Sequence, residues 1–147
     1  MVKGVGQVKR AERTKLLIEV GREEALQMAN EVCSHHEVIE IQAPREGLVM
    51  IKMRESAQQS LFYIGETLVT ETKVKIGEAF GLGLVREYEP ELSKALAIID
   101  AAYNGQLPVV AKWASVLTKL SQRLDMKQQD IKCSIERTKV QFDTMSI

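Results

Sequence analysis

The spacing of apolar residues changes twice along this chain, and this change constrains the fold more than any other feature of the sequence. Apolar side chains recur at helical spacing between residues 10 and 34, follow a strand-like pattern between 37 and 86, and return to helical spacing after 90. Helical side chains share a face about every 3.6 residues, whereas strand side chains alternate between two faces. The order predicts N-terminal helices, a central antiparallel sheet of hairpins and C-terminal helices, which is an α+β domain.

Two helices are expected before the sheet, over residues 10–20 and 22–34. Apolar residues of the second recur every three or four positions, and Gly21 marks the join between the two. Residues 1–8 carry neither pattern and are expected to be a loose leader. A chain of 147 residues suits one domain, so 1–147 is interpreted as a single domain.

Two further helical regions are expected after the sheet. Pro90 fits the first turn of the earlier one, and the Asn-Gly pair at 104–105 is a typical helix end. The later region carries an apolar stripe over 113–142, in steps of three and four residues over most of its length. Asp125 and Gln128 resemble a capping box within this stripe, which predicts a break in the helix.

Turn residues divide the strand-like region into segments. The sequence EVIEIQ alternates over 37–42, and LVMIKM begins a second strand at residue 48. Pro44–Gly47 lies between these segments and has the composition of a turn. The following segment, 60–76, is rich in β-branched and aromatic residues, with Gly65 as an expected bulge or turn.

The segment Lys75–Val85 reads KIGEAFGLGLV and holds three of the nine glycines. Glycine-rich loops can close backbone N–H groups around phosphates, so two interpretations compete. A phosphate loop should deliver its N–H groups at a helix N-terminus, and the P-loop version needs Gly-Lys followed by Ser or Thr. Here the next residues, LVRE, continue a strand. A β-hairpin that turns after Ile76 is therefore favoured over a nucleotide loop.

Gly81 and Gly83 give the second strand of that hairpin an unusual face. They alternate with Leu82 and Leu84, so one face of the strand carries no side chains. Glycine weakens a strand interior unless a close approach requires it. The bare face is therefore expected to lie under a bulky neighbour or to admit another backbone.

Composition excludes several classes of protein. Twenty basic and twenty acidic residues cancel, so no global field favours nucleic acid. No apolar run approaches the ~20 residues that span a membrane. Cys33 and Cys133 lack metal-type spacing and no signal peptide precedes them, which predicts a reduced, cytoplasmic protein.

Candidate catalytic residues are sparse. His35 and His36 are adjacent, so they are poorly placed to chelate one metal, and an exposed pair is the favoured interpretation. Glu37 and Glu40 could serve as an acid–base pair, as could the glutamates at 87, 89 and 91, but surface charge is favoured because nothing places them in a cleft. By residue chemistry alone, the chain is a soluble module without a visible active site.

Four segments of the chain occur in the order seen in a known bacterial family. They read EVIEIQAPREGLVMIKMR, FYIGETLVTETKVKI, GLGLV followed by ALAIIDAAY, and RTKVQFDTM. The most specific motifs lie at 46–49, 65–70 and 138–145. In this order and spacing, Glu37 to Met145 resembles the G component of the bacterial carbon–phosphorus lyase core complex, and the helix at 10–26 resembles it more weakly.

The resemblance implies an accessory role in a multisubunit enzyme. The implied partners are the lyase components H, I and J and the ATPase-like component L, with component I the most direct contact and the seat of the nucleosidase chemistry. With H, I and L, the G component is required to displace adenine from ATP with an alkylphosphonate, which gives ribose 1-alkylphosphonate 5-triphosphate. ATP and the phosphonate are substrates of the complex, and no cofactor or metal is expected on this chain.

The C-terminal motif and the bare glycine face are expected to contact a partner. Docking on a larger protein of the complex would use the sheet and the amphipathic C-terminal segment, with the ring of Phe142 anchored in an apolar groove. The residues expected to bind a partner are Gly81, Gly83, Thr138, Lys139, Phe142 and Met145.

Four departures separate this chain from the usual family pattern. Glu71 stands where relatives carry Arg, and Arg86-Glu87-Tyr88 replaces Gly-Arg-Asp. Leu92 replaces a His, and Phe142-Asp143 replaces a double Phe. Because an exchange of Arg for Glu reverses a charge, any family contact at that position does not carry over.

Two rival functions stay open at this point. One is an enzyme that acts alone on a phosphorylated small molecule, and activity of the purified chain would reveal it. The other is a structural or adaptor protein that self-associates or binds another partner, which the reversed charge at Glu71 would permit.

Overall fold

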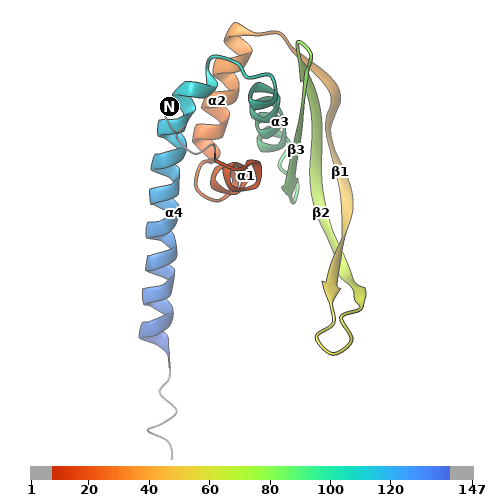
Figure 1. Ribbon diagram of the computed structural model, residues 1–147, viewed down its shortest axis with the longest axis vertical. Coiled ribbons are helices and arrows are strands. Elements are labelled where there is room, and N and C mark those ends of the chain that lie inside the picture. Colours follow the sequence, from red (N-terminus) through yellow and green to blue (C-terminus); the bar gives the residue numbers. More distant parts are fainter. Residues whose placement is uncertain (1–7, 140–147) are drawn as a thin grey trace, which may run out of the picture.

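The computed structural model describes residues 8–139, and the structural statements below concern that part of the chain. Two helices, three strands and two further helices follow one another along it (Figure 1). Their bounds are α1 Arg10–Glu19, α2 Arg22–His35, β1 Val38–Arg54, β2 Leu61–Ile76, β3 Ala79–Arg86, α3 Pro90–Asn104 and α4 Val110–Thr138. The α+β order predicted from the change of period is confirmed.

The three strands form one antiparallel sheet in the order β1-β2-β3. β3 pairs only with residues 69–76 of β2. The rest of β2 pairs with β1 alone, from Leu68 opposite Leu48 to Leu61 opposite Arg54. The β1–β2 hairpin therefore continues past the three-stranded sheet as a two-stranded extension (Figure 1). We call residues 47–54 and 61–68 the distal ribbon, and the helices with the three-stranded sheet the body.

The β2–β3 hairpin turns at Gly77 and Glu78, with Ile76 paired to Ala79. Gly77 has a φ of 58°, in the left-handed region that glycine adopts without steric cost. The glycine-rich segment leads into β3 and not into a helix. The hairpin interpretation is confirmed, and the backbone lacks the strand-to-helix geometry of a phosphate loop.

The prediction of a turn at Pro44–Gly47 is wrong, because β1 runs through this segment without a break. The pairing register shifts between Gln42 and Arg45, so the extra residues are accommodated as an irregularity in the strand. β1 lies at the edge of the sheet. An edge strand tolerates proline there because a missing N–H on its open side removes no ladder hydrogen bond.

The prediction of a bulge at Gly65 is confirmed. Ile51 pairs with Gly65 and Lys52 pairs with Tyr63, which leaves Ile64 without a partner on β1. One extra residue on β2 locally increases the twist of the hairpin. The strand continues on both sides of it, so Gly65 marks a bulge and not a turn.

The helices lie on one side of the sheet in successive layers (Figure 1). α3 packs directly on β2 and β3, α1 and α2 cover α3, and α4 packs against α1 and α2. The core runs through all these layers and includes Leu17 of α1, Val32 of α2, Val74 of β2, Ile99 of α3 and Trp113 of α4, each no more than 1% exposed. The other face of the sheet carries no helix among the described residues.

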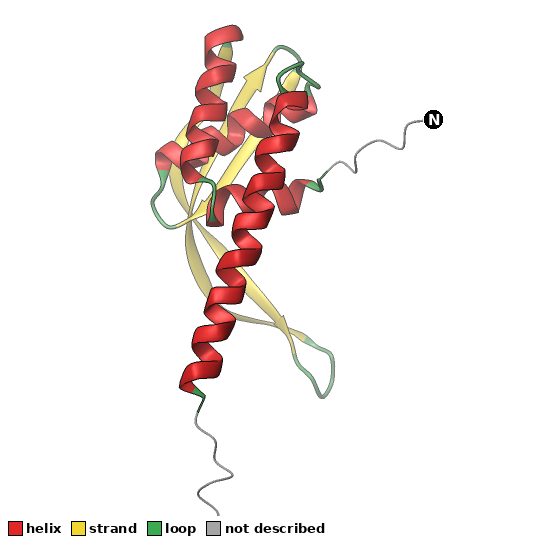
Figure 2. Cartoon of the chain, turned by 90° about the vertical axis from the view of Figure 1, so that its left-hand side faces the viewer, coloured by secondary structure: helices red, strands yellow, loops and turns green. Residues whose placement is uncertain are grey.

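The predicted break at Asp125 is wrong, because α4 is one helix of 29 residues. Its body-facing side chains Trp113, Leu117, Leu120 and Leu124 are buried, and from Asp125 to Lys139 every residue is exposed. Residues 125–130 contain neither Gly nor Pro and include several good helix formers, so polarity alone does not end the helix. Viewed from the side of α4, this second half projects from the body (Figure 2).

Candidate functional site

The bare face of β3 is occupied by α3 of the same chain. A Cβ atom at Gly81 would overlap the backbone of Ala97 and Ala101, and one at Gly83 would overlap the backbone of Ser93 and Ala97. The two glycines therefore let the helix backbone approach the strand more closely than any other residue would allow. Small residues at 93, 97 and 101 of α3, about one helical turn apart, complete this contact.

The close approach is held by a buried hydroxyl cluster. The Ser93 hydroxyl lies 2.8 Å from the Thr72 hydroxyl, and it is 3.0 Å from the Gly83 carbonyl oxygen and 3.1 Å from that of Thr70. Thr70, Thr72 and Ser93 are each fully buried. Because buried hydroxyl groups cost free energy unless they are hydrogen-bonded, these contacts favour this one register of helix on sheet.

Polar side chains of α3 also bond to the outer edge of β3. The Leu82 N–H donates to the Asp100 carboxylate at 3.1 Å, and the Asn104 amide donates to the Phe80 carbonyl oxygen at 2.7 Å. Edge strands otherwise present a row of free backbone groups. At these two positions, side chains of α3 already bond to the backbone groups with which a strand from another protein would pair.

Asp100 further anchors the first helix of the chain. It accepts hydrogen bonds from Arg10 at 2.8 Å and from Arg13 at 3.1 Å, and both Asp100 and Arg13 are buried. Burial lowers the pKa of Arg13 below its ordinary value, although the adjacent Asp100 carboxylate opposes that shift. The guanidinium also lies 3.8 Å from the centre of the Tyr103 ring. One carboxylate thus ties α1, α3 and β3 together.

These contacts correct the expectation that a partner covers Gly81 and Gly83. Their face is filled by α3, so in this structure neither glycine is open to another protein. The sequence predicted either a bulky neighbour or another backbone on this face, with a partner as the cover, whereas the structure places the backbone of α3 from the same chain there. The small residues at 93, 97 and 101 could have indicated the contact with α3, because their spacing places them on one face of a helix.

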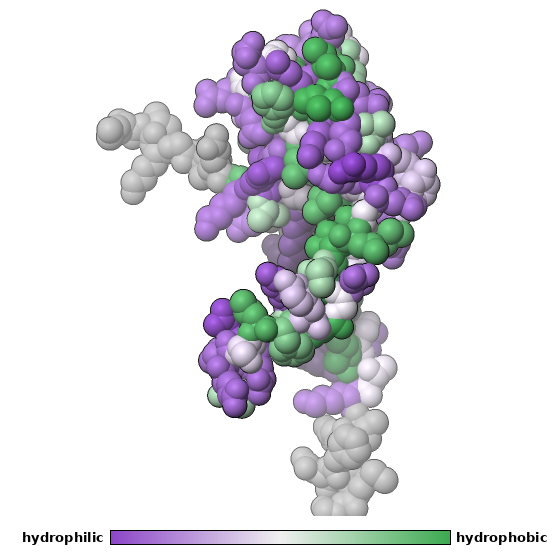
Figure 3. Space-filling model, turned by 90° about the vertical axis from the view of Figure 1, so that its right-hand side faces the viewer, coloured by the Kyte–Doolittle hydropathy of each residue, from purple (hydrophilic) through white to green (hydrophobic). Residues whose placement is uncertain are grey.

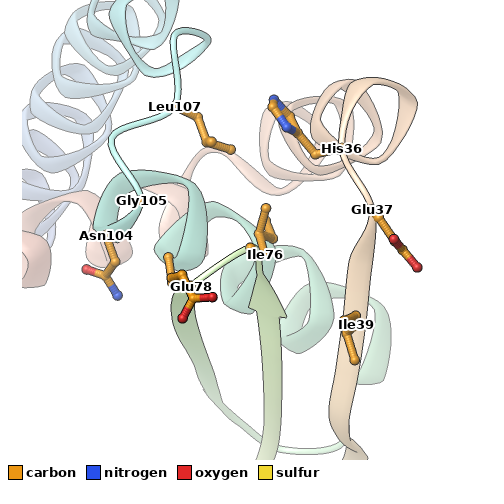
Figure 4. Close-up of a pocket in the computed structure, with 10 residues that line it drawn as sticks. His36, Glu37, Ile39, Ile76, Glu78, Asn104, Gly105 and Leu107 are labelled. Carbon is orange, nitrogen blue, oxygen red and sulfur yellow. The ribbon is translucent and has the colours of Figure 1, made fainter.

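A cavity of about 560 Å³ lies beside the Gly77 turn, between β1, β2 and the end of α3. Figure 4 shows that its polar side chains do not converge: His36 and Glu37 project in different directions, and Glu78 and Asn104 lie across the cavity from them. Among the described residues, no cluster of three His, Cys, Asp or Glu side chains could hold a metal ion. The cavity therefore lacks a nucleophile–base pair or a metal-ligand set.

The most exposed apolar surface lies on the distal ribbon. Ten large apolar side chains there are between 38% and 64% exposed, and no residue of the ribbon is buried. They are Leu48, Val49, Met50, Ile51, Met53, Leu61, Phe62, Tyr63, Ile64 and Leu68. Figure 3 shows the side of the sheet opposite the helices, and apolar side chains gather along this arm on that side too. A group of exposed apolar side chains of this size is typical of a protein–protein contact.

Sequence reasoning missed the ribbon as a site, although the sequence carried a signal. A strand with one face in water alternates apolar and polar residues, whereas LVMI at 48–51 and LFYI at 61–64 are apolar at every position. Such runs indicate strands that are covered on both faces. The body covers neither run, and so both faces remain open.

The C-terminal motif begins at the tip of α4. The Thr138 hydroxyl donates to the carbonyl oxygens of Ser134 and Ile135 at 3.1 Å each, so it bonds within its own helix. Lys139 follows as the C-terminal cap residue in an extended conformation. Both are exposed, and neither contacts the body. Phe142 and Met145 lie outside the described residues, and their partner-binding role stays a prediction.

The positions that depart from the usual family pattern have different surroundings. The Glu71 carboxylate lies 3.5 Å from the Lys73 ammonium and 3.8 Å from the Arg45 guanidinium. Leu92 is part of the core, so no polar role is available to it. Glu87 has a φ of 65°, and there the chain leaves β3 toward α3. Glu71 is thus paired within its own sheet.

The structure defines a small helix-on-sheet protein that presents a long apolar arm and has no assembled catalytic cluster in its described part. An exposed apolar arm of this kind is typical of proteins that bind other proteins. A family model for phosphonate metabolism protein PhnG matches residues 8–146, and the chain belongs to this family. Membership implies a role in phosphonate metabolism. No curated protein matches the chain.

The described helices do not meet the requirements of a membrane span. None of them is both long and apolar enough to cross a bilayer. Among them, only α4 has sufficient length, and charged residues occur along its whole second half.

Proposed function

We propose that this chain is an accessory subunit of the carbon–phosphorus lyase complex that docks on its partners through the distal ribbon and the second half of α4. The single observation that carries the proposal is the ribbon: ten exposed apolar side chains on an arm that the body does not cover. Family membership supports the choice of complex. The partners are the lyase components H, I, J and L, and component I is the most direct contact.

In this proposal the complex transfers the ribose triphosphate of ATP to an alkylphosphonate and releases adenine. The chain supplies structure to that reaction, and the acid–base chemistry is on component I. The scattered directions of His36, Glu37 and Glu78 around the 560 Å³ cavity support this division of roles. ATP and the phosphonate bind the assembly, and the enzyme is a transferase only as a complex.

Binding and activity are measured together to test the proposal. The chain is co-expressed with component I from the same source and analysed by size exclusion at micromolar concentration, and adenine release from ATP with methylphosphonate is followed with components H, I and L. We expect co-elution with component I, and adenine release only when this chain is present. Separate elution would contradict docking, and undiminished release without the chain would contradict the accessory role.

The same assay separates the two rival functions. Adenine release by the purified chain alone, abolished by Glu37→Gln or His36→Ala, would identify an independent enzyme. Self-association without binding to any other lyase protein would identify a structural protein. The ribbon gives the second rival a physical basis, because exposed apolar strands also pair with copies of themselves.

A further inference from the structure

The end of β1 and the residue after it form a segment that begins and ends with the same charged pair. The segment 45–55 reads REGLVMIKMRE, with Arg45 and Glu46 at one end and Arg54 and Glu55 at the other. All four charged side chains are exposed. When such a segment lies antiparallel to a copy of itself, opposite ends of the two copies meet, and each arginine can face a glutamate.

The backbone of this segment can accept another strand. β1 lies at the edge of the sheet, and every residue from Arg45 to Arg54 pairs with β2 in an unbroken series along β1. The extra residue of the bulge, Ile64, is on β2. The segment contains no proline, so each residue keeps the N–H that a ladder of hydrogen bonds requires. The opposite edge of the sheet differs, because side chains of α3 bond to the backbone of β3.

We propose that β1 pairs antiparallel with β1 of a second copy of this chain, about a two-fold axis at Met50. In this register Glu46 of each copy lies opposite Arg54 of the other, and Arg45 lies opposite Glu55. A two-fold axis makes each contact twice, so pairs of opposite charge flank the apolar centre on both sides. Opposite charges that face each other across two strands stabilise the pairing, whereas like charges destabilise it.

The register at Met50 matches the segment better than the neighbouring registers do. Here Val49 lies opposite Ile51, so apolar side chains meet between the charged ends. A symmetric pair keeps the same faces together, and its axis can therefore move only from one residue to the next. With the axis at Val49, one kind of opposite-charge pair remains, between Glu46 and Lys52, and with the axis at Ile51 none remains. The charges thus select Met50.

The faces of the ribbon stay available in such a dimer. Edge pairing uses backbone groups of β1 and leaves the side chains above and below the sheet. The ribbon extends past the body (Figure 1), and the two copies run in opposite directions, so the body of each copy lies beyond the ribbon tip of the other. The inference therefore goes beyond the proposed function, because a lyase partner can still dock on the ribbon of either copy.

Charge reversal tests the pairing in the full-length chain, with sedimentation equilibrium as the measurement. Arg54→Glu places like charges opposite each other twice and should raise the Kd of the dimer by about tenfold. The double variant Glu46→Arg/Arg54→Glu exchanges the two charges and should return the Kd to within about threefold of the wild-type value. Arg86→Glu makes the same reversal at an exposed residue of β3, on the other edge of the sheet, and should leave the Kd unchanged.

Single cysteines test the register. They are introduced after the exposed Cys33 and Cys133 have been replaced by Ser. Directly opposite residues of antiparallel strands have Cα atoms about 4.5–5.5 Å apart, which is within the range of a disulfide. Met50→Cys should therefore give a covalent dimer on oxidation. Met53→Cys is the control and should not, because the two copies of residue 53 would lie about 20 Å apart.

Several results would overturn the inference. They are a wild-type chain that stays monomeric at about 100 μM, a dimer that Arg54→Glu does not weaken, and a double variant that does not recover the dimer. Stronger cross-linking by Val49→Cys or Ile51→Cys than by Met50→Cys would place the axis elsewhere and also overturn it. A monomeric chain that co-elutes with component I would leave the proposed function intact. A dimer that binds no other lyase protein would support this inference and contradict the proposed function.

Discussion

The two halves of the β1–β2 hairpin are made of the same pair of strands, yet their surroundings are opposite. Next to α3, the inward positions of β2 are Thr70, Thr72 and Val74, and each of them is fully buried. In the distal ribbon, the same face of the hairpin includes Leu68 and Met50, which are large and apolar but are exposed. The comparison teaches that burial in this protein follows the reach of α3 and not the hydrophobicity of the strand. The body buries its apolar side chains within one chain, whereas the ribbon leaves its apolar side chains exposed.

The largest expected effect on stability comes from adding a side chain where α3 packs on the glycines of β3. Gly83→Ala should lower the free energy of unfolding by about 4 kcal/mol or more, because the new Cβ atom meets the backbone of Ser93. Gly47→Ala, at the start of the ribbon with no atom within 4 Å of the new Cβ, is the control. Urea denaturation of the isolated chain measures both. Equal losses at the two positions would contradict the contrast between body and ribbon.

A smaller loss is expected when the charge that joins α1 to α3 is removed. Asp100→Asn leaves the buried guanidinium of Arg13 without its counter-charge, which should cost about 3 kcal/mol. Arg13→Met in the same background should recover part of this loss, since it removes the unpaired charge. Thermal unfolding of the single and double variants gives the comparison. Full stability of Asp100→Asn would show that the ion pair is not needed.

The smallest effect on stability is expected in the ribbon. The same substitution, Leu to Ala, is compared at one position in the body and one in the ribbon. Leu96 in α3 is 5% exposed and Leu61 in the ribbon is 59% exposed. Leu96→Ala should cost about 2–5 kcal/mol, whereas Leu61→Ala should change the stability of the isolated chain by less than about 0.5 kcal/mol. Urea denaturation of both variants checks this difference. A large loss for Leu61→Ala would mean that the ribbon is part of the cooperative fold.

Much of this fold follows from local pattern. The period of the apolar residues predicted the order of the elements, and Gly77 with its neighbours predicted the β2–β3 turn. Two predictions failed for different reasons. β1 absorbs Pro44 because it lies at an open edge of the sheet, and α4 passes Asp125 because the local residues are compatible with a helix and none of them breaks it. The origin of the backbone that meets Gly81 and Gly83 does not follow from the strand pattern alone. It depends on how α3, the next element of the chain, folds back over β3, and the glycine spacing shows this only when it is compared with the small residues at 93, 97 and 101.

The open edge of β1 has a consequence for the production of this protein in the cell. A newly made chain exposes 17 residues of strand edge, and that edge includes the continuous apolar run at 48–51. Edges of this kind recruit other strands, and chains of one sequence recruit each other most readily at high concentration. Synthesis in excess of its partners would therefore lead to aggregation. Under the proposed docking, a supply of this chain that matches that of its partners would keep the exposed arm short-lived.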